Sequence, residues 1–334
     1  MKLSLIKYIY LLGIIGSNMV KKKRCLRDEA LYNTIQENEF LNFFDFVRHI
    51  SLLISNEQSG KKKKMRDVIT CLIVWHKFPN LSARRAKSFL LFLKKFKIIN
   101  ANIPCFKTLC NYRAEPIMQN LLNEIITKSS KPLAKIEKDF ATDMTGIKTK
   151  LFSSWFSLRC KKRIKRRDHL NAHISIGTKS LIVTAINIEA KQGNDNIIFR
   201  EHVDKTTKNF KINEWSGDGM YWAKENCKKI IEVGGKPYFK CKSNWWNGKQ
   251  SGCPAWKEMN QEAIENKEEY DKHYHKRSKV ESANHSKKAL FGDKVYSKLK
   301  EARENEETLR WINHNINVLN RARYEWDINP LSED

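Results

Sequence analysis

The spacing of apolar residues changes once along this chain, near Lys138, and that change limits the folds that the chain can adopt. Before it, from Leu26 to about Ile136, apolar residues recur only at helical spacing. After it, short segments alternate between apolar and polar residues, as strands do. We therefore expect an all-α region followed by a region that contains a β-sheet. The expected helices of the first region cover residues 28–38, 40–55, 65–77, 82–97, 105–113 and 115–128.

The second region begins with KDFATDMTGI, a strand that we expect to end at Asp143. A β-hairpin follows, with strands over 169–177 and 181–190 and a turn at Gly177–Ser180. The later elements are a helix at about 194–202, the short strand WSGDG with Asp218 at its end, the helix YWAKENCKKIIEVGG, and a strand over 236–242. This order, β-β-β-α-β-α-β and then a helix, predicts a mixed β-sheet flanked by helices, an α/β architecture in a chain that is α+β overall.

The charge of the chain indicates a polyanionic partner. The 63 Lys and Arg residues against 37 Asp and Glu give a net charge of +26, which favours nucleic acid. Three basic blocks are interpreted as phosphate contacts: KKKR at 21–24, KKKK at 61–64 and RCKKRIKRR at 159–167. The candidate contacts in the last block are Arg163, Lys165, Arg166 and Arg167. A protein that is merely basic is the alternative that charge alone leaves open.

The cysteines and the N-terminal run favour the cytoplasm. The eight cysteines form no C-x2-C pair, and no His pair follows at zinc-finger spacing, so we expect reduced thiols. The run LSLIKYIYLLGIIG is interrupted by Lys7 and is too short to span a bilayer. We treat residues 1–25 as a separate segment, either a mis-assigned start with translation from Met19 or a core helix. A signal peptide is the less favoured alternative, and we expect no membrane association.

Residues 82–113 are compatible with a helix-turn-helix. An amphipathic helix that Ser82 caps leads through a turn at Asn100–Pro104 into the short helix CFKTLCNYR. The side chains that would face DNA are Lys107, Asn111, Tyr112 and Arg113. A purely structural helical bundle gives the same pattern, and we keep both interpretations.

One segment, YHKRSKVESANHSKK, combines an aromatic residue, two cations and a carboxylate at the spacing Tyr-x2-Arg-x3-Glu-x6-Lys. These residues are Tyr274, Arg277, Glu281 and Lys288, and on a single helix they would project from one stripe. Such a stripe is a poor core face. It suits a surface that holds a metal ion and binds phosphates.

This spacing resembles the signature of DDE transposases, in the insertion-sequence branch named after those four residues. The resemblance covers about Lys138 to Leu290 and implies two more carboxylates at strand ends, for which Asp143 and Asp218 are the candidates. It implies a ribonuclease H-like catalytic domain over 137–293, with a short insertion at 243–270. The helical, basic region 26–136 would precede this domain, and C-terminal helices in 294–334 would pack on it.

The resemblance also implies a chemistry. Asp143, Asp218 and Glu281 would be the catalytic residues and would hold two Mg²⁺ ions, for which Mn²⁺ can substitute. Asp143 would bridge the two ions. Tyr274, Arg277 and Lys288 would bind DNA. The expected reaction is cleavage at transposon ends, followed by attack of the freed 3′-hydroxyl on target DNA.

Such a protein would bind double-stranded DNA, act as a homodimer in the DNA-bound synaptic complex, and reside in the prokaryotic cytoplasm with the nucleoid. Two alternatives remain: a non-catalytic DNA-binding relative and a stand-alone two-metal nuclease. Trp245 and Trp246 are interpreted as core residues in preference to base-stacking ones. His169 and His173 are interpreted as ordinary strand residues.

Overall fold

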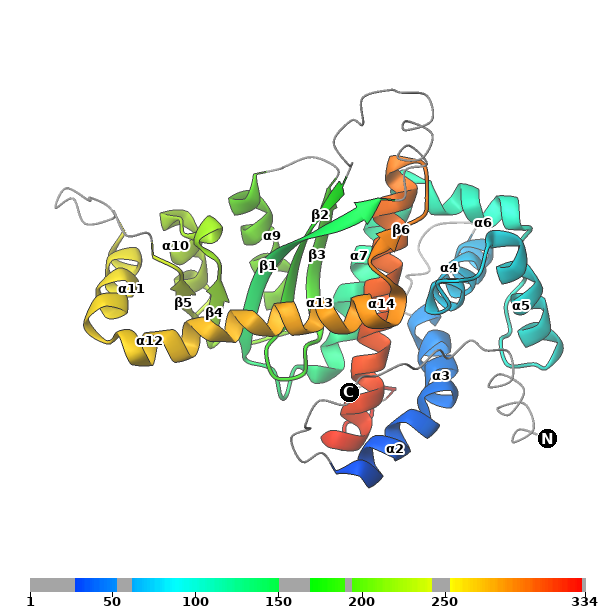
Figure 1. Cartoon of the computed structure of the whole chain (residues 1–334), viewed down its shortest axis with the longest axis horizontal. Helices are drawn as coiled ribbons and strands as arrows, with labels where there is room; N and C mark the ends of the chain where they lie inside the picture. The colour runs from blue at the N-terminus through cyan, green and yellow to red at the C-terminus, as the bar shows by residue number, and fades with distance from the viewer. Residues whose placement is uncertain (1–27, 53–61, 150–168, 190–193, 242–252, 332–334) are drawn as a thin grey trace, which may run out of the picture.

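A mixed β-sheet lies at the centre of the molecule, with helices on both faces and an extensive helical region beyond one edge (Figure 1). The computed structural model describes residues 28–52, 62–149, 169–189, 194–241 and 253–331, and for residues 62–64 it describes the backbone alone. The sheet has the order β3-β2-β1-β4-β5, with β6 also beside β1. The strands are β1 (Asp139–Thr149), β2 (His169–Gly177), β3 (Val183–Glu189), β4 (Glu214–Gly217), β5 (Lys236–Phe239) and β6 (Lys294–Val295). The expected mixed α/β sheet is therefore confirmed.

The strands divide into an antiparallel half and a parallel half. β1 pairs antiparallel with β2, which pairs antiparallel with β3. β4 runs parallel to β1, and β5 runs parallel to β4. The parallel connections contain helices, as parallel pairing requires. These are α9 (Asp195–Thr207) between β3 and β4, and α10 (Lys224–Glu232) between β4 and β5.

Alternation along β1 assigns its residues to two hydrophobic clusters. Phe140 belongs to a cluster with residues of α9 and α10, together with α11 (Pro254–Glu265) and α12 (Lys267–Tyr274). Ala141 and Ile147 point to the opposite face, where they join a cluster that includes α13 (Ser278–Phe291). Asp143 has the same parity as Ala141, and so it lies on the α13 face of the sheet.

The six helices expected before residue 136 are all present. Asp28 and Ser82 cap two of them through their side-chain oxygens, and Pro116 occupies a first-turn position of another. Their bounds are α2 (Glu29–Glu37), α3 (Glu39–Leu52), α4 (Lys62–Lys77), α5 (Ala83–Lys95), α6 (Phe106–Arg113) and α7 (Pro116–Ser130). The hydrophobic cluster that contains α3 to α7 continues into the sheet.

The long C-terminal helix α14 (Lys300–Glu325) connects the helical region to the sheet (Figure 1). Its buried asparagines each bond a different element. Asn315 accepts from the backbone N–H of Val183 and donates to its carbonyl, which holds β3. Asn313 donates to the carbonyl of Ile73 in α4, and Asn320 donates to that of Ile35 in α2. Because these carbonyls are buried, each hydrogen bond restricts how the helices pack.

Three local expectations were wrong. β1 does not end at Asp143 but continues to Thr149, because its antiparallel pairing with β2 extends to Lys148. A further short strand, β6, pairs with the end of β1. The segment that carries the four-residue spacing is not one α-helix: α12 ends at Tyr274, and the 3₁₀ turn η3 (His275–Arg277) separates it from α13. Within the described residues, no helix is both long enough and apolar enough to cross a membrane.

Candidate active site

Strand register brings Asp143 and Asp218 to neighbouring positions. The parallel pairing of β1 with β4 ends where Thr142 lies opposite Gly217. Asp143 in β1 and Asp218, the residue after β4, come next, at a point where the paired strands lie only about 4.8 Å apart. Although β1 itself continues, its pairing with β4 stops here, so the two carboxylates lie at the end of the parallel part of the sheet.

Glu281 reaches the same place from a helix on the sheet face. Its helix α13 packs on β1 and is fixed to α14 by an ion pair between Lys287 and Glu307, both fully buried. Arg277, in the turn before α13, connects the carboxylates of β1 and α13. Its Nη1 donates to Asp143 Oδ2 at 2.7 Å, and its Nη2 lies 2.9 Å from Glu281 Oε1.

The charges of Asp218 and Glu281 act on the carboxyl group of Asp143. Burial raises the pKa of Asp143, and the negative charges of Asp218 and Glu281 raise it further. The guanidinium of Arg277 and the backbone N–H of Met144 oppose this rise but do not cancel it. Within the described part of the chain, Asp218 has no ion-pair partner, and its Oδ1 accepts from the Gly219 N–H at 2.7 Å. Negative charge therefore exceeds the positive charge paired with it.

Two further residues of the four-residue spacing lie close to this centre. Lys288 donates to Thr145 Oγ1 of β1 at 3.3 Å, and so it points to the same sheet face as Asp143. Burial lowers the pKa of the Arg277 guanidinium, but Asp143 and the nearby Tyr274 raise it, and the net shift is upward. The expected single stripe is thus distributed over the end of α12, the 3₁₀ turn and α13.

A buried polar chain supports Asp218 from the other face of the sheet. Tyr221 belongs to the short turn that begins after Asp218, and its hydroxyl lies 3.1 Å from His173 Nδ1. His173 Nε2 lies 3.4 Å from Asp195 Oδ1. Burial lowers the pKa of His173 and raises that of Tyr221 well above its usual value, so we assign a neutral Tyr221 that donates to a neutral imidazole.

Sequence reasoning interpreted His173 as an ordinary strand residue and so missed this support. The signal that was available is the row of polar residues at every second position of β2: Asn171, His173 and Ser175. All three are buried in the structure. Three alternate polar side chains on one face of an apolar strand indicate a polar network under that face.

The donor atoms fit a hard divalent cation, although the carboxylates are not arranged around one. Three carboxylates supply the oxygen ligands that Mg²⁺ prefers. Within the described residues, no group of three or more His, Cys, Asp or Glu side chains is placed to hold a metal ion. The guanidinium of Arg277 lies between Asp143 and Glu281, and it provides the positive charge there.

A second pair of carboxylates lies four residues back along the chain from Asp143 and Asp218, which is two repeats of the strand pleat. Asp139 and Glu214 are opposite each other in the β1–β4 register. Lys276 Nζ lies 2.8 Å from Asp139 Oδ2 and also pairs with Glu214. His273 Nδ1 lies 2.5 Å from Glu214 Oε2, and its ring stacks on Tyr238 with centroids 4.6 Å apart. We call Asp139, Glu214, Lys276 and His273 the paired cluster.

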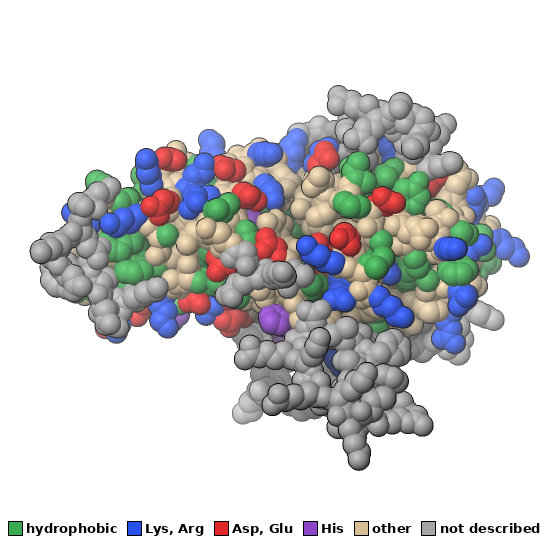
Figure 2. All heavy atoms as spheres, turned by 90° about the horizontal axis from the view of Figure 1, so that it is seen from above, with side chains coloured by type: hydrophobic (Ala, Val, Ile, Leu, Met, Phe, Trp, Pro, Cys, Tyr) green, Lys and Arg blue, Asp and Glu red, His purple; other side chains and the backbone are tan. Residues whose placement is uncertain are grey.

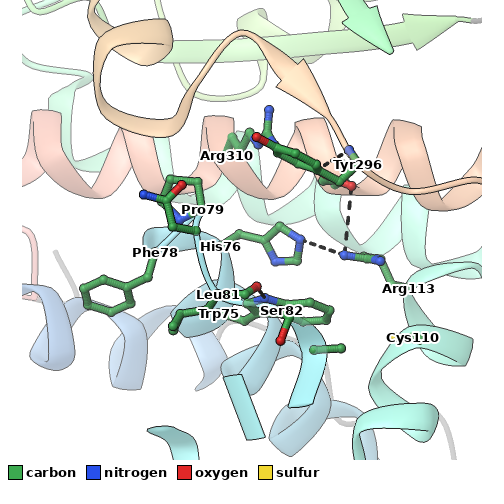
Figure 3. Close-up of a pocket in the computed structure, with 13 residues that line it drawn as sticks. Trp75, His76, Phe78, Pro79, Leu81, Ser82, Cys110, Arg113, Tyr296 and Arg310 are labelled. Carbon is green, nitrogen blue, oxygen red and sulfur yellow. Dashed lines mark hydrogen bonds and ion pairs between the residues drawn. The ribbon is translucent and has the colours of Figure 1, made fainter. Parts of the chain in front are cut away.

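The candidate DNA contacts of the helical region differ in exposure. Lys107 is exposed on α6. Arg113 instead points inward, where it contacts His76 Nε2 at 3.2 Å and lies over the Trp75 ring at 4.6 Å (Figure 3). The connection from α5 to α6, residues 96–105, is longer than the turn of about three or four residues in a helix-turn-helix.

Arg113 lines a cavity of about 440 Å³ between the end of α4, the start of α5 and α14. Trp75, His76, Tyr296 and Arg310 also line it (Figure 3), and none of the three candidate carboxylates does. The other predicted contacts, Arg163, Lys165, Arg166 and Arg167, lie outside the described residues, as do Trp245 and Trp246. Seen from above, described Lys and Arg side chains are interspersed with Asp and Glu (Figure 2).

Comparisons with protein-family models, with curated proteins and with solved structures found no match to this chain.

Proposed function

We propose that the protein is a DNA transposase that uses Asp143, Asp218 and Glu281 for metal-dependent phosphodiester cleavage and strand transfer. The observation that carries this proposal is that Asp143 lies beside Asp218 in the β1–β4 register and shares the guanidinium of Arg277 with Glu281. The β-β-β-α-β-α-β order and the mixed sheet support a ribonuclease H-like catalytic domain, as the four-residue spacing implies.

In this proposal the carboxylates would hold two Mg²⁺ ions, or Mn²⁺ in their place, with Asp143 as the shared ligand. When bound, such ions supply an activated attacking oxygen and stabilise the leaving oxygen of an in-line displacement. Arg277 and Lys288 place positive charge beside these carboxylates, where a DNA phosphate would lie. The Tyr221–His173 contact holds the turn after Asp218 and so limits where its carboxylate can move.

The net charge of +26 supports a DNA partner. Transposon ends and target are both double-stranded DNA, and joining two ends implies a homodimer on DNA. We place this activity in the prokaryotic cytoplasm, in association with the nucleoid, as the resemblance to insertion-sequence transposases implies.

The test uses labelled duplex DNA that carries the sequences flanking the gene, with and without Mg²⁺, and the full-length protein. We expect nicks and, with added target DNA, joined strand-transfer products. Glu281→Gln should give neither while retaining DNA binding, because it removes a ligand but leaves the cations in place. Nicks without joined products would indicate a stand-alone nuclease. DNA binding without Mg²⁺-dependent nicking in the wild type would indicate a non-catalytic DNA-binding protein.

A further inference from the structure

Arg277 connects two candidate metal ligands that belong to different elements. Asp143 is on β1 and Glu281 is on α13, and Arg277 uses one guanidinium nitrogen for each, at 2.7 and 2.9 Å. Glu281 is 59% exposed, and in the described part of the chain Arg277 is its ion-pair partner. The approach of Glu281 to Asp143 therefore depends on a positive charge that the protein itself supplies.

Both carboxylate oxygens of Asp143 already accept a hydrogen bond. Its Oδ1 accepts from the Met144 N–H at 3.0 Å, and its Oδ2 accepts from Arg277 at 2.7 Å. A divalent cation held between Asp143 and Glu281 would occupy the position of the guanidinium, whose charge would repel it at short range. Arg277 and a cation therefore compete for the same two carboxylates.

We propose that Arg277 is a placeholder for the divalent cation: off DNA it holds Asp143 and Glu281 together, and it leaves them for a DNA phosphate as the cation binds. This inference rests on the proposed function. A guanidinium bonds phosphate as readily as carboxylate, so the exchange keeps its charge paired. Because DNA removes the competitor, DNA and the cation should bind cooperatively. Arg277 thus positions the ligands when no DNA is present and acts as a phosphate ligand when DNA is bound.

The neighbouring residue offers a matched control. Lys276 carries the same charge in the same 3₁₀ turn, but it pairs with Asp139 and Glu214 in the paired cluster. Replacing either cation with Gln removes one positive charge from this region. Only Arg277→Gln removes the group that contacts the candidate metal ligands.

The experiment measures Mn²⁺ binding to the full-length protein without DNA, from the electron paramagnetic resonance signal of free Mn²⁺. We expect Arg277→Gln to bind Mn²⁺ about tenfold more tightly than the wild type, and Lys276→Gln to stay within about twofold. Arg277→Lys keeps the charge but loses the two-pronged contact, so it should tighten binding by a smaller factor. It provides the measurement if Arg277→Gln does not fold.

A second arm measures binding of a fluorescent DNA duplex with and without Mn²⁺. We expect Mn²⁺ to strengthen DNA binding by the wild type and Lys276→Gln more than by Arg277→Gln. Equal strengthening in all three would contradict the exchange of partners.

Asp143→Asn separates failure of the inference from failure of the proposed function. If Asp143→Asn abolishes Mn²⁺ binding but Arg277→Gln leaves it unchanged or weakens it, the placeholder role is wrong and the metal site stands. If Asp143→Asn binds Mn²⁺ like the wild type, the proposed metal site itself is wrong.

Discussion

Two groups of carboxylates lie on the same sheet face, where β1 and β4 run side by side, and they differ in how their charges are matched. In the paired cluster, Asp139 and Glu214 meet two basic side chains, Lys276 and His273. In the candidate active site, the described residues include one cation that is paired directly with the carboxylates: Arg277, which contacts Asp143 and Glu281. Consecutive residues of one turn, Lys276 and Arg277, thus serve the two groups.

The degree to which carboxylates are matched by cations distinguishes a structural group of charges from a functional one, even when the two groups lie on the same strands. A group that stabilises the fold satisfies its own charges, because an unpaired buried charge costs free energy. A group that must receive a cation keeps an excess of negative charge. Burial is the main cause of the raised pKa of Asp143, and the negative charges of Asp218 and Glu281 raise it further.

The largest expected difference between the two groups is in activity. Asp143→Asn should lower Mg²⁺-dependent nicking by roughly a thousandfold or more, since it removes the shared ligand. Asp139→Asn, made on the same strand and face, should change nicking by less than about threefold. Single-turnover nicking rates on the same labelled duplex check this. A similar loss in both variants would mean that the distinction between the groups is false.

Stability should respond to the paired cluster. Glu214→Gln should lower the free energy of unfolding by about 2 kcal/mol, because it leaves Lys276 and His273 without a largely buried partner charge. Urea unfolding followed by circular dichroism measures this change. An unchanged unfolding midpoint would show that these ion pairs contribute nothing to stability.

Asp143→Asn, which removes a carboxylate from the candidate active site, should raise the stability of the fold, whereas Glu214→Gln should lower it. Burial and like charges raise the pKa of Asp143, so its ionised form is less favourable in the folded than in the unfolded protein. Without metal, Asp143→Asn should therefore raise the melting temperature at neutral pH by a few degrees. The gain should fade as the pH falls through the raised pKa toward the usual Asp value, because the wild-type carboxyl then becomes neutral. Thermal melts in EDTA across this pH range check the sign, and a lower melting temperature at neutral pH would contradict it.

The smallest effect is expected for Glu281. Its side chain is 59% exposed and pairs with Arg277 four residues earlier, and such pairs contribute little to stability. Glu281→Gln should change the free energy of unfolding by less than about 0.5 kcal/mol while abolishing nicking. Denaturant unfolding of this variant beside Glu214→Gln gives the comparison. A loss of stability as large as that of Glu214→Gln would assign Glu281 a structural role.

Residue patterns were sufficient for most elements, although not for α11, η3 or β6, and for one carboxylate position. Alternation over 169–177 and 181–190 predicted the hairpin. The Gly-flanked WSGDG segment predicted a short strand with Asp218 at its end, and β4 ends one residue earlier, at Gly217. These features depend on residues close together in sequence. The six N-terminal helices were predictable for the same reason.

The contacts that distinguish the two groups depend on register between distant segments, which local patterns do not contain. Nothing local to Asp143 shows that β1 continues while its pairing with β4 stops beside it. The 3₁₀ turn at His275–Arg277 likewise decides which cation meets which carboxylate, and uniform helical spacing did not predict it. Lys276 meets Asp139 and Glu214 together because the β1–β4 register places these two carboxylates opposite each other.

The most direct test of the central claim is to let bound Fe²⁺ mark its own site on the protein. In place of Mg²⁺, and with ascorbate and peroxide, Fe²⁺ cleaves the polypeptide beside the residues that hold it. We predict cuts near Asp143, Asp218 and Glu281 that excess Mg²⁺ suppresses and that Asp143→Asn eliminates. Cuts that persist in Asp143→Asn, or that map to Asp139 and Glu214 instead, would contradict the claim that these three carboxylates form the cation site.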